Sequence, residues 1–228
     1  MKKQLLLSLI LIFVIRMAGV AQKEIGPIVT LKSAPMTDIS VRINKDGATI
    51  TEMPSTDVVM KAAYAQAKKE HKNVMVIFHA SWCGWCKKME ASINEPELKP
   101  LFDANYVITY IDVLENKDKK DLENPGSTEM LAKYKGDKGG IPFWFVADAK
   151  GKELADSQIR PEGASMDTYG NGVGCPAEES EVAYFVKILK STSKLNDDQL
   201  AMISKRFAQN KPAPVVKPAV VKPVATSK

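Results

Sequence analysis

Two cysteines separated by two residues stand at the start of a predicted helix, and this placement constrains the fold more than any other feature. Cys83 and Cys86 follow a short apolar run, Val74 to Phe78, that predicts a buried strand, and the helix after them is predicted to reach about Ile93. Backbone N–H groups in the first turn of a helix lack partners and the dipole is positive there, so a thiolate is favoured over a thiol. Because a thiolate attacks disulfides and a nearby second thiol can release the mixed disulfide, this junction predicts thiol–disulfide exchange.

The first 21 residues have the three parts of a secretory signal peptide. Lys2 and Lys3 precede an apolar run from Leu5 to Ile15, and the small residues that end at Ala21 offer a cleavage site. The run is too short for a comfortable membrane span, although an uncleaved anchor is the alternative. We therefore expect a periplasmic or secreted protein with no stable membrane insertion after cleavage of residues 1–21.

Charge and cysteine content narrow the class of protein further. Cleavage would lower the formal net charge from +5 to +2, because Lys2, Lys3 and Arg16 would leave with the signal. So small an excess does not favour nucleic acid or an anionic membrane as a partner. The chain has three cysteines, whereas a secreted scaffold held by disulfides would have more, in even number. One close pair and one further cysteine indicate redox chemistry.

Apolar periodicity predicts helices and strands in alternation. Pro96 and Pro100 are expected to break the chain after the cysteine helix, and 115–126 is predicted to be a charged loop. This order predicts an α/β fold with a central mixed β-sheet flanked by helices. The expected elements are a helix from 55–57 to about 70, a strand at 74–78, the cysteine helix to about 93, a strand at 106–113, a helix at 128–134, strands at 143–146 and 152–159, and helices at 178–189 and about 197–208.

Four segments are expected after the signal peptide. They are an N-terminal extension at 22–55 with a strand-like stretch near 39–43, a main domain at 56–192, a C-terminal helix within 193–209 and a tail at 210–228. The tail is rich in proline, lysine and valine, a composition that cannot build a core. We therefore expect the tail to be disordered.

A longer motif resembles a known family. Trp82-Cys83-Gly84-Trp85-Cys86-Lys87 is followed about 55 residues later by Gly140-Ile141-Pro142 and a hydrophobic strand, and this combination resembles the thioredoxin-fold family. The stretch from Asn94 to Asp112 is similar to the secreted bacterial thioredoxin-like branch of thiol–disulfide oxidoreductases. The resemblance covers roughly residues 56–192 and implies a thioredoxin fold with an N-terminal extension and a C-terminal helix plus tail.

The resemblance implies roles for named residues. Cys83 would be the exposed attacking thiol and Cys86 the more buried resolving thiol. Pro142 would carry a cis peptide bond against the cysteine pair, leaving the Ile141 backbone free to pair with an extended substrate segment. No metal and no bound cofactor are implied; the partners would be exported proteins with disulfides and a dithiol electron donor.

The three tryptophans lie in the two segments that would meet at this site. Trp85 should be exposed beside Cys83, and together with Trp82 it could give substrate an apolar contact surface. Trp144 is a strand residue, and we expect it in the core.

The sequence departs from the family pattern beside the cysteines. Thioredoxin has a buried acid six residues before the first cysteine, and Ile77 stands at that position here. His79 is a candidate substitute by its closeness in sequence, but a structural or exposed histidine is the favoured interpretation. The dipeptide between the cysteines is Gly84-Trp85 instead of Gly-Pro, which leaves the reduction potential open.

Cys175 is the third cysteine. It precedes Pro176 and two glutamates, a pattern typical of a helix start, which predicts Cys175 as an N-cap with a lowered pKa. We expect a free, half-buried thiol near the edge of the sheet where the cysteine pair lies, with Cys83 and Cys86 bonded to each other.

The leading functional hypothesis is an extracytoplasmic thiol–disulfide oxidoreductase acting on exported proteins. One alternative is a metal- or haem-maturation binding module that uses Cys83 and Cys86 as soft ligands, although only two histidines are available to complete such a site. Another is a non-catalytic binding domain with a permanent disulfide.

Overall fold

The structure is a computed structural model. It describes residues 29–30, 40–43 and 49–212, with side chains from residue 52 onward. The predicted signal peptide at 1–21, much of the N-terminal extension and the tail from 213 lie outside the described residues. In the part of the chain that is described, no helix has the length and apolar character needed to cross a membrane.

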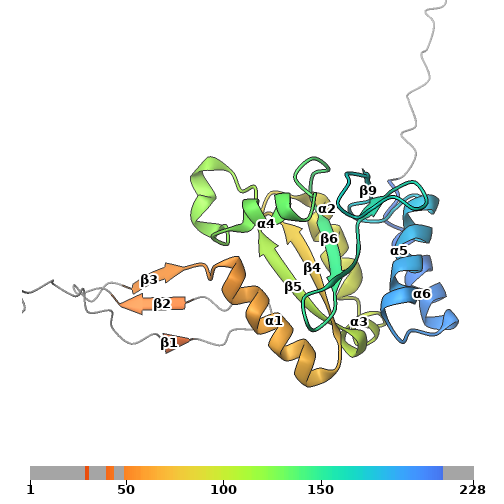
Figure 1. The fold of residues 1–228 in the computed structure, drawn as a ribbon, viewed down its shortest axis with the longest axis horizontal. Helices are drawn as coiled ribbons and strands as arrows, with labels where there is room; N and C mark the ends of the chain where they lie inside the picture. Colours follow the sequence, from red (N-terminus) through yellow and green to blue (C-terminus); the bar gives the residue numbers. More distant parts are fainter. Residues whose placement is uncertain (1–28, 31–39, 44–48, 213–228) are drawn as a thin grey trace, which may run out of the picture.

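A four-stranded mixed sheet forms the centre of the fold, with the strand order β5-β4-β6-β7 (Figure 1). β4 (Asn73–His79) and β5 (Tyr106–Asp112) are parallel and pair in register along their whole length. β6 (Phe143–Ala147) runs antiparallel to β4, and β7 (Glu153–Asp156) runs antiparallel to β6. This arrangement confirms the α/β fold class with a mixed sheet that the periodicity predicted.

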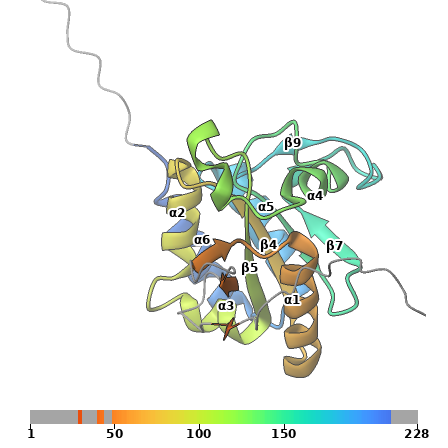
Figure 2. The ribbon, with the colours of Figure 1, turned by 90° about the vertical axis from the view of Figure 1, so that its left-hand side faces the viewer.

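Both faces of the sheet are covered by helices, as the strand side chains show. Alternate residues of β4 and β6 belong to two separate hydrophobic clusters, one on each face. Burial on both faces explains why these strands read as continuous apolar runs. Figures 1 and 2 show α1 on one side of the sheet and α5 and α6 on the other.

The first cluster packs α1 (Thr56–Glu70) and α4 (Ser127–Lys133) on the sheet. α1 begins after Ser55 and ends at Glu70, within the limits that the periodicity predicted. It buries small residues such as Ala63 and Ala67, which bring the helix close to the strands.

The second cluster contains residues of α2 (Gly84–Ile93), α3 (Lys99–Asn105), α5 (Glu179–Thr192) and α6 (Asp197–Ala208). Trp144 of β6 is fully buried here, as expected. Its ring lies 5.2 Å from that of Phe185, which in turn lies 4.8 Å from the ring of Phe207. α6 is therefore an integral part of the core.

The expected break at Pro100 is wrong, because this proline lies in the first turn of α3. Proline is tolerated there because the N–H that it lacks has no partner in the helix, and its fixed φ suits helical backbone. The predicted charged loop at 115–126 contains a short 3₁₀ helix, η1 (Lys117–Leu122).

The single strand expected at 152–159 is also wrong, because the chain leaves the sheet at Ser157. The Ser157 N–H donates to the Trp144 carbonyl and its hydroxyl accepts from the Trp144 N–H. β8 (Gln158–Ile159) then pairs with β9 (Asn171–Gly172) in a separate two-stranded sheet. A side chain that bonds to the neighbouring backbone competes with a regular strand ladder, which local alternation does not reveal.

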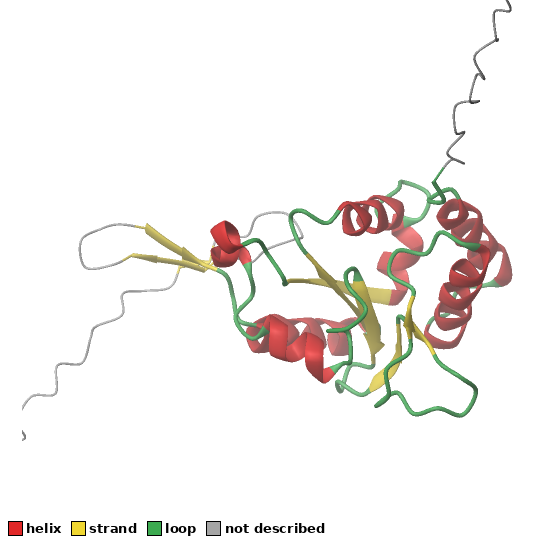
Figure 3. Ribbon diagram, turned by 90° about the horizontal axis from the view of Figure 1, so that it is seen from above, coloured by secondary structure: helices red, strands yellow, loops and turns green. Residues whose placement is uncertain are grey.

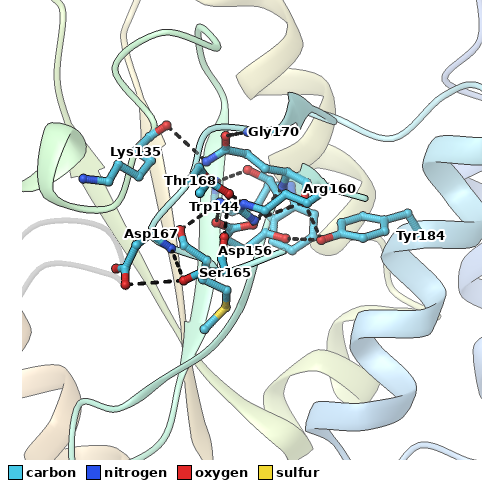
Figure 4. A network of polar contacts seen from close by, with 12 residues as sticks. Lys135, Trp144, Asp156, Arg160, Ser165, Asp167, Thr168, Gly170 and Tyr184 are labelled. Atoms are coloured by element: carbon cyan, nitrogen blue, oxygen red, sulfur yellow. Dashed lines mark hydrogen bonds and ion pairs between the residues drawn. The ribbon is translucent and has the colours of Figure 1, made fainter. Parts of the chain in front are cut away.

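A buried ion pair holds the loop between β8 and β9 (Figure 4). Arg160 donates to both carboxylate oxygens of Asp156 at 2.7 and 2.6 Å, and the two side chains are 7% and 0% exposed. The same guanidinium donates to the carbonyls of Met166 and Thr168. The loop is thus fastened to the edge of the sheet.

The expectation that the disordered tail begins at residue 210 is wrong for Asn210 itself. Asn210 is buried, and its amide donates to the Ser92 hydroxyl at 3.2 Å. It also lies within hydrogen-bond distance of the Pro176 carbonyl. A polar side chain that finds several buried partners is held in place, so the packed chain extends through Asn210.

Three short strands of the N-terminal extension form an antiparallel sheet in the order β1-β2-β3 (Figure 3). They are β1 (Val29–Thr30), β2 (Ser40–Ile43) and β3 (Thr49–Glu52). β2 is the strand that the sequence predicted near 39–43.

Candidate active site

Cys83 and Cys86 form a disulfide at the start of α2, just beyond the end of β4. Cys83 is the N-cap residue, and the Cys86 N–H points at its sulfur at 3.1 Å. The N–H groups at a helix start lack helical partners, so a sulfur at this position receives one of them. The same interaction would favour a thiolate on Cys83 in the reduced protein.

The tertiary structure brings Ile141 and Pro142 to this pair. The carbonyl oxygen of Ile141 lies 3.6 Å from Cys83 Sγ, and the Ile141 side chain packs on Ala80, Cys83 and Cys86. The Ile141–Pro142 peptide bond is cis, the configuration that the resemblance implied. Within the described residues, the N–H and carbonyl of Ile141 make no backbone hydrogen bond.

The expectation that Cys83 is exposed and Cys86 is more buried is wrong for the disulfide form. Cys83 is 3% exposed and Cys86 4% exposed, so accessibility does not distinguish them in the disulfide form. The physical reason is the packing of Ile141, which lies 58 residues away in sequence, against the disulfide. The difference between the two sulfurs is their place on α2, where Cys83 is the cap and Cys86 lies inside the first turn.

Two large aromatic side chains are exposed beside the pair, as expected for Trp85. Trp82 is 50% exposed and Trp85 41% exposed. The Trp82 indole N–H donates to the Leu114 carbonyl at 2.8 Å, and the Lys88 ammonium lies 4.5 Å from the centre of the Trp85 ring. Both rings are therefore anchored while offering apolar area to solvent.

Ile77 and His79, the two residues considered in place of the buried acid of thioredoxin, are both packed among core or strand side chains. Ile77 is buried in the second cluster, so its position supplies no proton acceptor. His79 Nε2 lies 3.2 Å from Asp112 Oδ1 without hydrogen-bond geometry, and its ring is 5.2 Å from that of Tyr110. These neighbours fit the structural role that the sequence favoured for His79.

Cys175 is a free thiol, as expected, but the expected N-cap with a lowered pKa is wrong. The N-cap of α5 is Glu178, which forms a capping box with Glu181. Cys175 lies in the preceding loop, where burial raises the pKa of its thiol to about 12. The thiol is therefore protonated at neutral pH.

We predict that iodoacetamide leaves Cys175 unmodified in the native oxidised protein at pH 8. The reagent attacks thiolates, and this thiol is both buried and protonated at that pH. Peptide mapping after alkylation, with and without urea, measures the effect. Rapid native modification, or a disulfide that joins Cys175 to either other cysteine, would contradict the assignment.

Sequence reasoning missed one buried charge next to the pair. The sequence predicts Glu115 in a charged loop, yet its carboxylate is buried and accepts hydrogen bonds from Ser81. No local pattern separates this glutamate from its charged neighbours, so the sequence carries no signal for its burial. Among the described residues, no group of three or more His, Cys, Asp and Glu side chains is placed to hold a metal ion.

Comparison with known proteins agrees with the fold. Residues 58–149 match a family model described as thioredoxin-like. The bovine (Bos taurus) protein disulfide-isomerase A5 is 33% identical over 82 residues, which are 35% of this chain and 16% of that protein. A probable protein disulfide-isomerase ER-60 from Schistosoma mansoni is 40% identical over 47 residues, 21% of this chain and 10% of that protein. The matches thus span only a small part of the length of these relatives.

Among solved structures, a disulphide isomerase from Xylella fastidiosa Temecula1 aligns with 21% identity and a TM-score of 0.37, covering 66% of this chain and 87% of that one. The matched segment at 58–149 contains the cysteine pair, the parallel strands β4 and β5, and the Ile141–Pro142 bond. The chain therefore has a thioredoxin-like fold, and its residues 58–149 match the thioredoxin-like family.

Proposed function

We propose that this protein is an extracytoplasmic thiol–disulfide oxidoreductase that reduces or exchanges disulfides in exported proteins. The observation that carries the proposal is the Cys83–Cys86 disulfide at the start of α2, in contact with Ile141. This arrangement combines a closable dithiol, a helix start that favours a thiolate and, at Ile141, an N–H and a carbonyl that form no backbone hydrogen bond within the described residues.

In the reducing direction, the Cys83 thiolate attacks one sulfur of a substrate disulfide. A Cys83–substrate bond forms, the substrate S–S bond breaks, and the other substrate sulfur leaves as a thiolate that takes a proton. Cys86 then loses its proton and attacks Cys83 Sγ, which releases the substrate as a dithiol and closes the Cys83–Cys86 disulfide. Two electrons pass from the cysteine pair to the substrate, and an external dithiol donor restores the pair without a bound cofactor.

Substrate binding would use the surface around the disulfide. The N–H and carbonyl of Ile141 could pair with an extended substrate segment, in the manner of strand addition, beside Pro142. Trp82 and Trp85 would supply apolar contact area next to the reacting sulfurs. The signal-peptide pattern in residues 1–21 supports a location outside the cytoplasm.

An insulin reduction assay tests the activity. With dithiothreitol as the electron donor, micromolar protein should accelerate the precipitation of reduced insulin, whereas the double variant Cys83→Ser/Cys86→Ser should give only the rate of dithiothreitol alone. No acceleration by a protein whose pair is shown to be reduced would favour a non-catalytic binding domain.

A further inference from the structure

A buried carboxylate holds the segment that leads into Cys83. Glu115 is 4% exposed and accepts hydrogen bonds from the Ser81 N–H at 2.5 Å and the Ser81 hydroxyl at 2.8 Å. One residue earlier, Leu114 has a left-handed backbone with φ of 56°, and its carbonyl accepts from the Trp82 indole. We call Ser81, Trp82, Leu114 and Glu115 the clamp.

The burial of Glu115 would be costly without these two bonds. A buried carboxylate is tolerated when hydrogen bonds replace its water, and both donors here come from one residue, Ser81. Among the described residues, no lysine, arginine or histidine forms an ion pair with Glu115. The carboxylate therefore depends on the position of Ser81, and Ser81 is fixed in return.

Glu115 is held in the loop after β5 by contacts that do not involve the cysteines. The Glu115 N–H donates to the Glu123 carboxylate at 2.7 Å, and Lys120 donates to the same carboxylate at 2.6 Å. The Asn124 side chain accepts from the Asp112 N–H at 2.7 Å at the end of β5. Because these contacts anchor the loop after β5, the clamp transmits the position of that loop to Ser81.

The other two residues of the clamp, Ser81 and Trp82, lead directly into Cys83, the proposed nucleophile. Ser81 and Trp82 directly precede Cys83, whose N–H donates to the Ala80 carbonyl at 3.0 Å in a tight turn. The Cys83 sulfur receives the Cys86 N–H only while Cys83 stays at the cap of α2. A shift of Ser81 and Trp82 would move the sulfur relative to that donor.

We propose that Glu115 is a positioning residue, whose carboxylate holds Cys83 at the start of α2 through Ser81 and so maintains the stabilisation of the Cys83 thiolate. The inference rests on the proposed function, since it assigns Cys83 as the attacking sulfur. The positioning role of Glu115 and the direct effect of its negative charge on the Cys83 thiolate predict opposite results when Glu115 is replaced. A negative charge near a thiolate disfavours it, so loss of the charge alone would favour the thiolate, whereas loss of the clamp would disfavour it.

Two substitutions separate these effects. Glu115→Gln removes the charge but can keep both contacts, because its carbonyl can accept from the Ser81 N–H and its amide can donate to the Ser81 hydroxyl. Glu115→Ala removes the charge and both contacts. Glu97→Ala, at an exposed carboxylate in another turn, is the matched control. The other titratable and charged groups joined to this network, Cys86, Glu123 and Lys120, are unchanged in all three.

The measurement is the pH dependence of iodoacetamide alkylation of Cys83 in the reduced full-length protein, followed by peptide mass. Cys175 serves as an internal report on folding, because it is buried and becomes reactive on unfolding. Alkylation needs no disulfide substrate. A failure of insulin reduction would therefore overturn the proposed function, while the effect of Glu115 on Cys83 alkylation could still be measured and interpreted.

We expect Glu115→Ala to raise the midpoint of Cys83 alkylation by about one pH unit, which is a tenfold smaller ratio of thiolate to thiol at a given pH. In Glu115→Gln this ratio should stay within about a factor of two of that in the unsubstituted protein. A lowered midpoint in both variants would show a direct charge effect and overturn the positioning role, as would unchanged midpoints in both. If Glu115→Ala unfolds, Ser81→Ala replaces it: a smaller rise would support the proposal, and an unchanged midpoint would overturn it.

Discussion

Cys86→Ser should capture disulfide-containing substrates as stable adducts on Cys83, and Cys83→Ser should lower disulfide reduction to the uncatalysed rate. Cys83 caps α2 and receives the Cys86 N–H, so its sulfur is the better placed to be a thiolate. Without Cys86, the mixed disulfide has no resolving thiol and accumulates. Non-reducing gels with mass spectrometry of the adduct provide the measurement, and insulin reduction gives the rate.

Cys175→Ser is the matched control for this pair, because it removes a free, buried thiol that has no part in the proposed reaction. It should leave both the adducts and the reduction rate unchanged. Adducts that form on Cys86 in the Cys83→Ser variant would reverse the assignment of the two sulfurs. Faster alkylation of Cys86 than of Cys83 in the reduced protein would lead to the same conclusion.

Arg160→Met should lower the free energy of unfolding by about 3–5 kcal/mol, the usual loss when one partner of a buried ion pair is removed. The substitution leaves the Asp156 carboxylate, which is 0% exposed, without the guanidinium that occupies both of its oxygens. It also removes the donors to the Met166 and Thr168 carbonyls. Urea unfolding at pH 7, followed by tryptophan fluorescence, measures the change.

Lys190→Met is the control for this prediction. Lys190 and Asp197 form an ion pair at 2.8 Å whose side chains are both largely exposed, so water screens the pair and its loss should change the stability far less than Arg160→Met does. The double variant Arg160→Met/Asp156→Leu should recover part of the stability, because it removes the uncompensated charge. Similar losses for Arg160→Met and Lys190→Met would show that the buried pair contributes no more than a surface pair.

Local pattern was sufficient for much of the fold. The apolar run of β4 appears in the sequence because both faces of the strand are buried, and the spacing of α1 appears because burial of one side of a helix imposes a repeat of 3.6 residues. The cysteine pair at the start of α2 could also be predicted, because both residues and their helix lie within one short segment.

The errors at Pro100 and Ser157 have separate causes. Pro100 occupies the first turn of a helix, which tolerates proline, and the Ser157 hydroxyl bonds to the backbone of a neighbouring strand.

The amino-acid sequence by itself determined the elements, their order and the presence of a dithiol at a helix start. The resemblance implied that Ile141 and Pro142 lie against that dithiol, whereas only the tertiary structure decided which other distant segments surround it. Ile141 contacts Cys83 across 58 residues, and Glu115 contacts Ser81 across 34. The surroundings of Cys175 likewise include Asn210, whose amide nitrogen lies 3.4 Å from its sulfur although it stands 35 residues further along the chain. Such contacts depend on how the layers pack, and no repeat within a single segment records them.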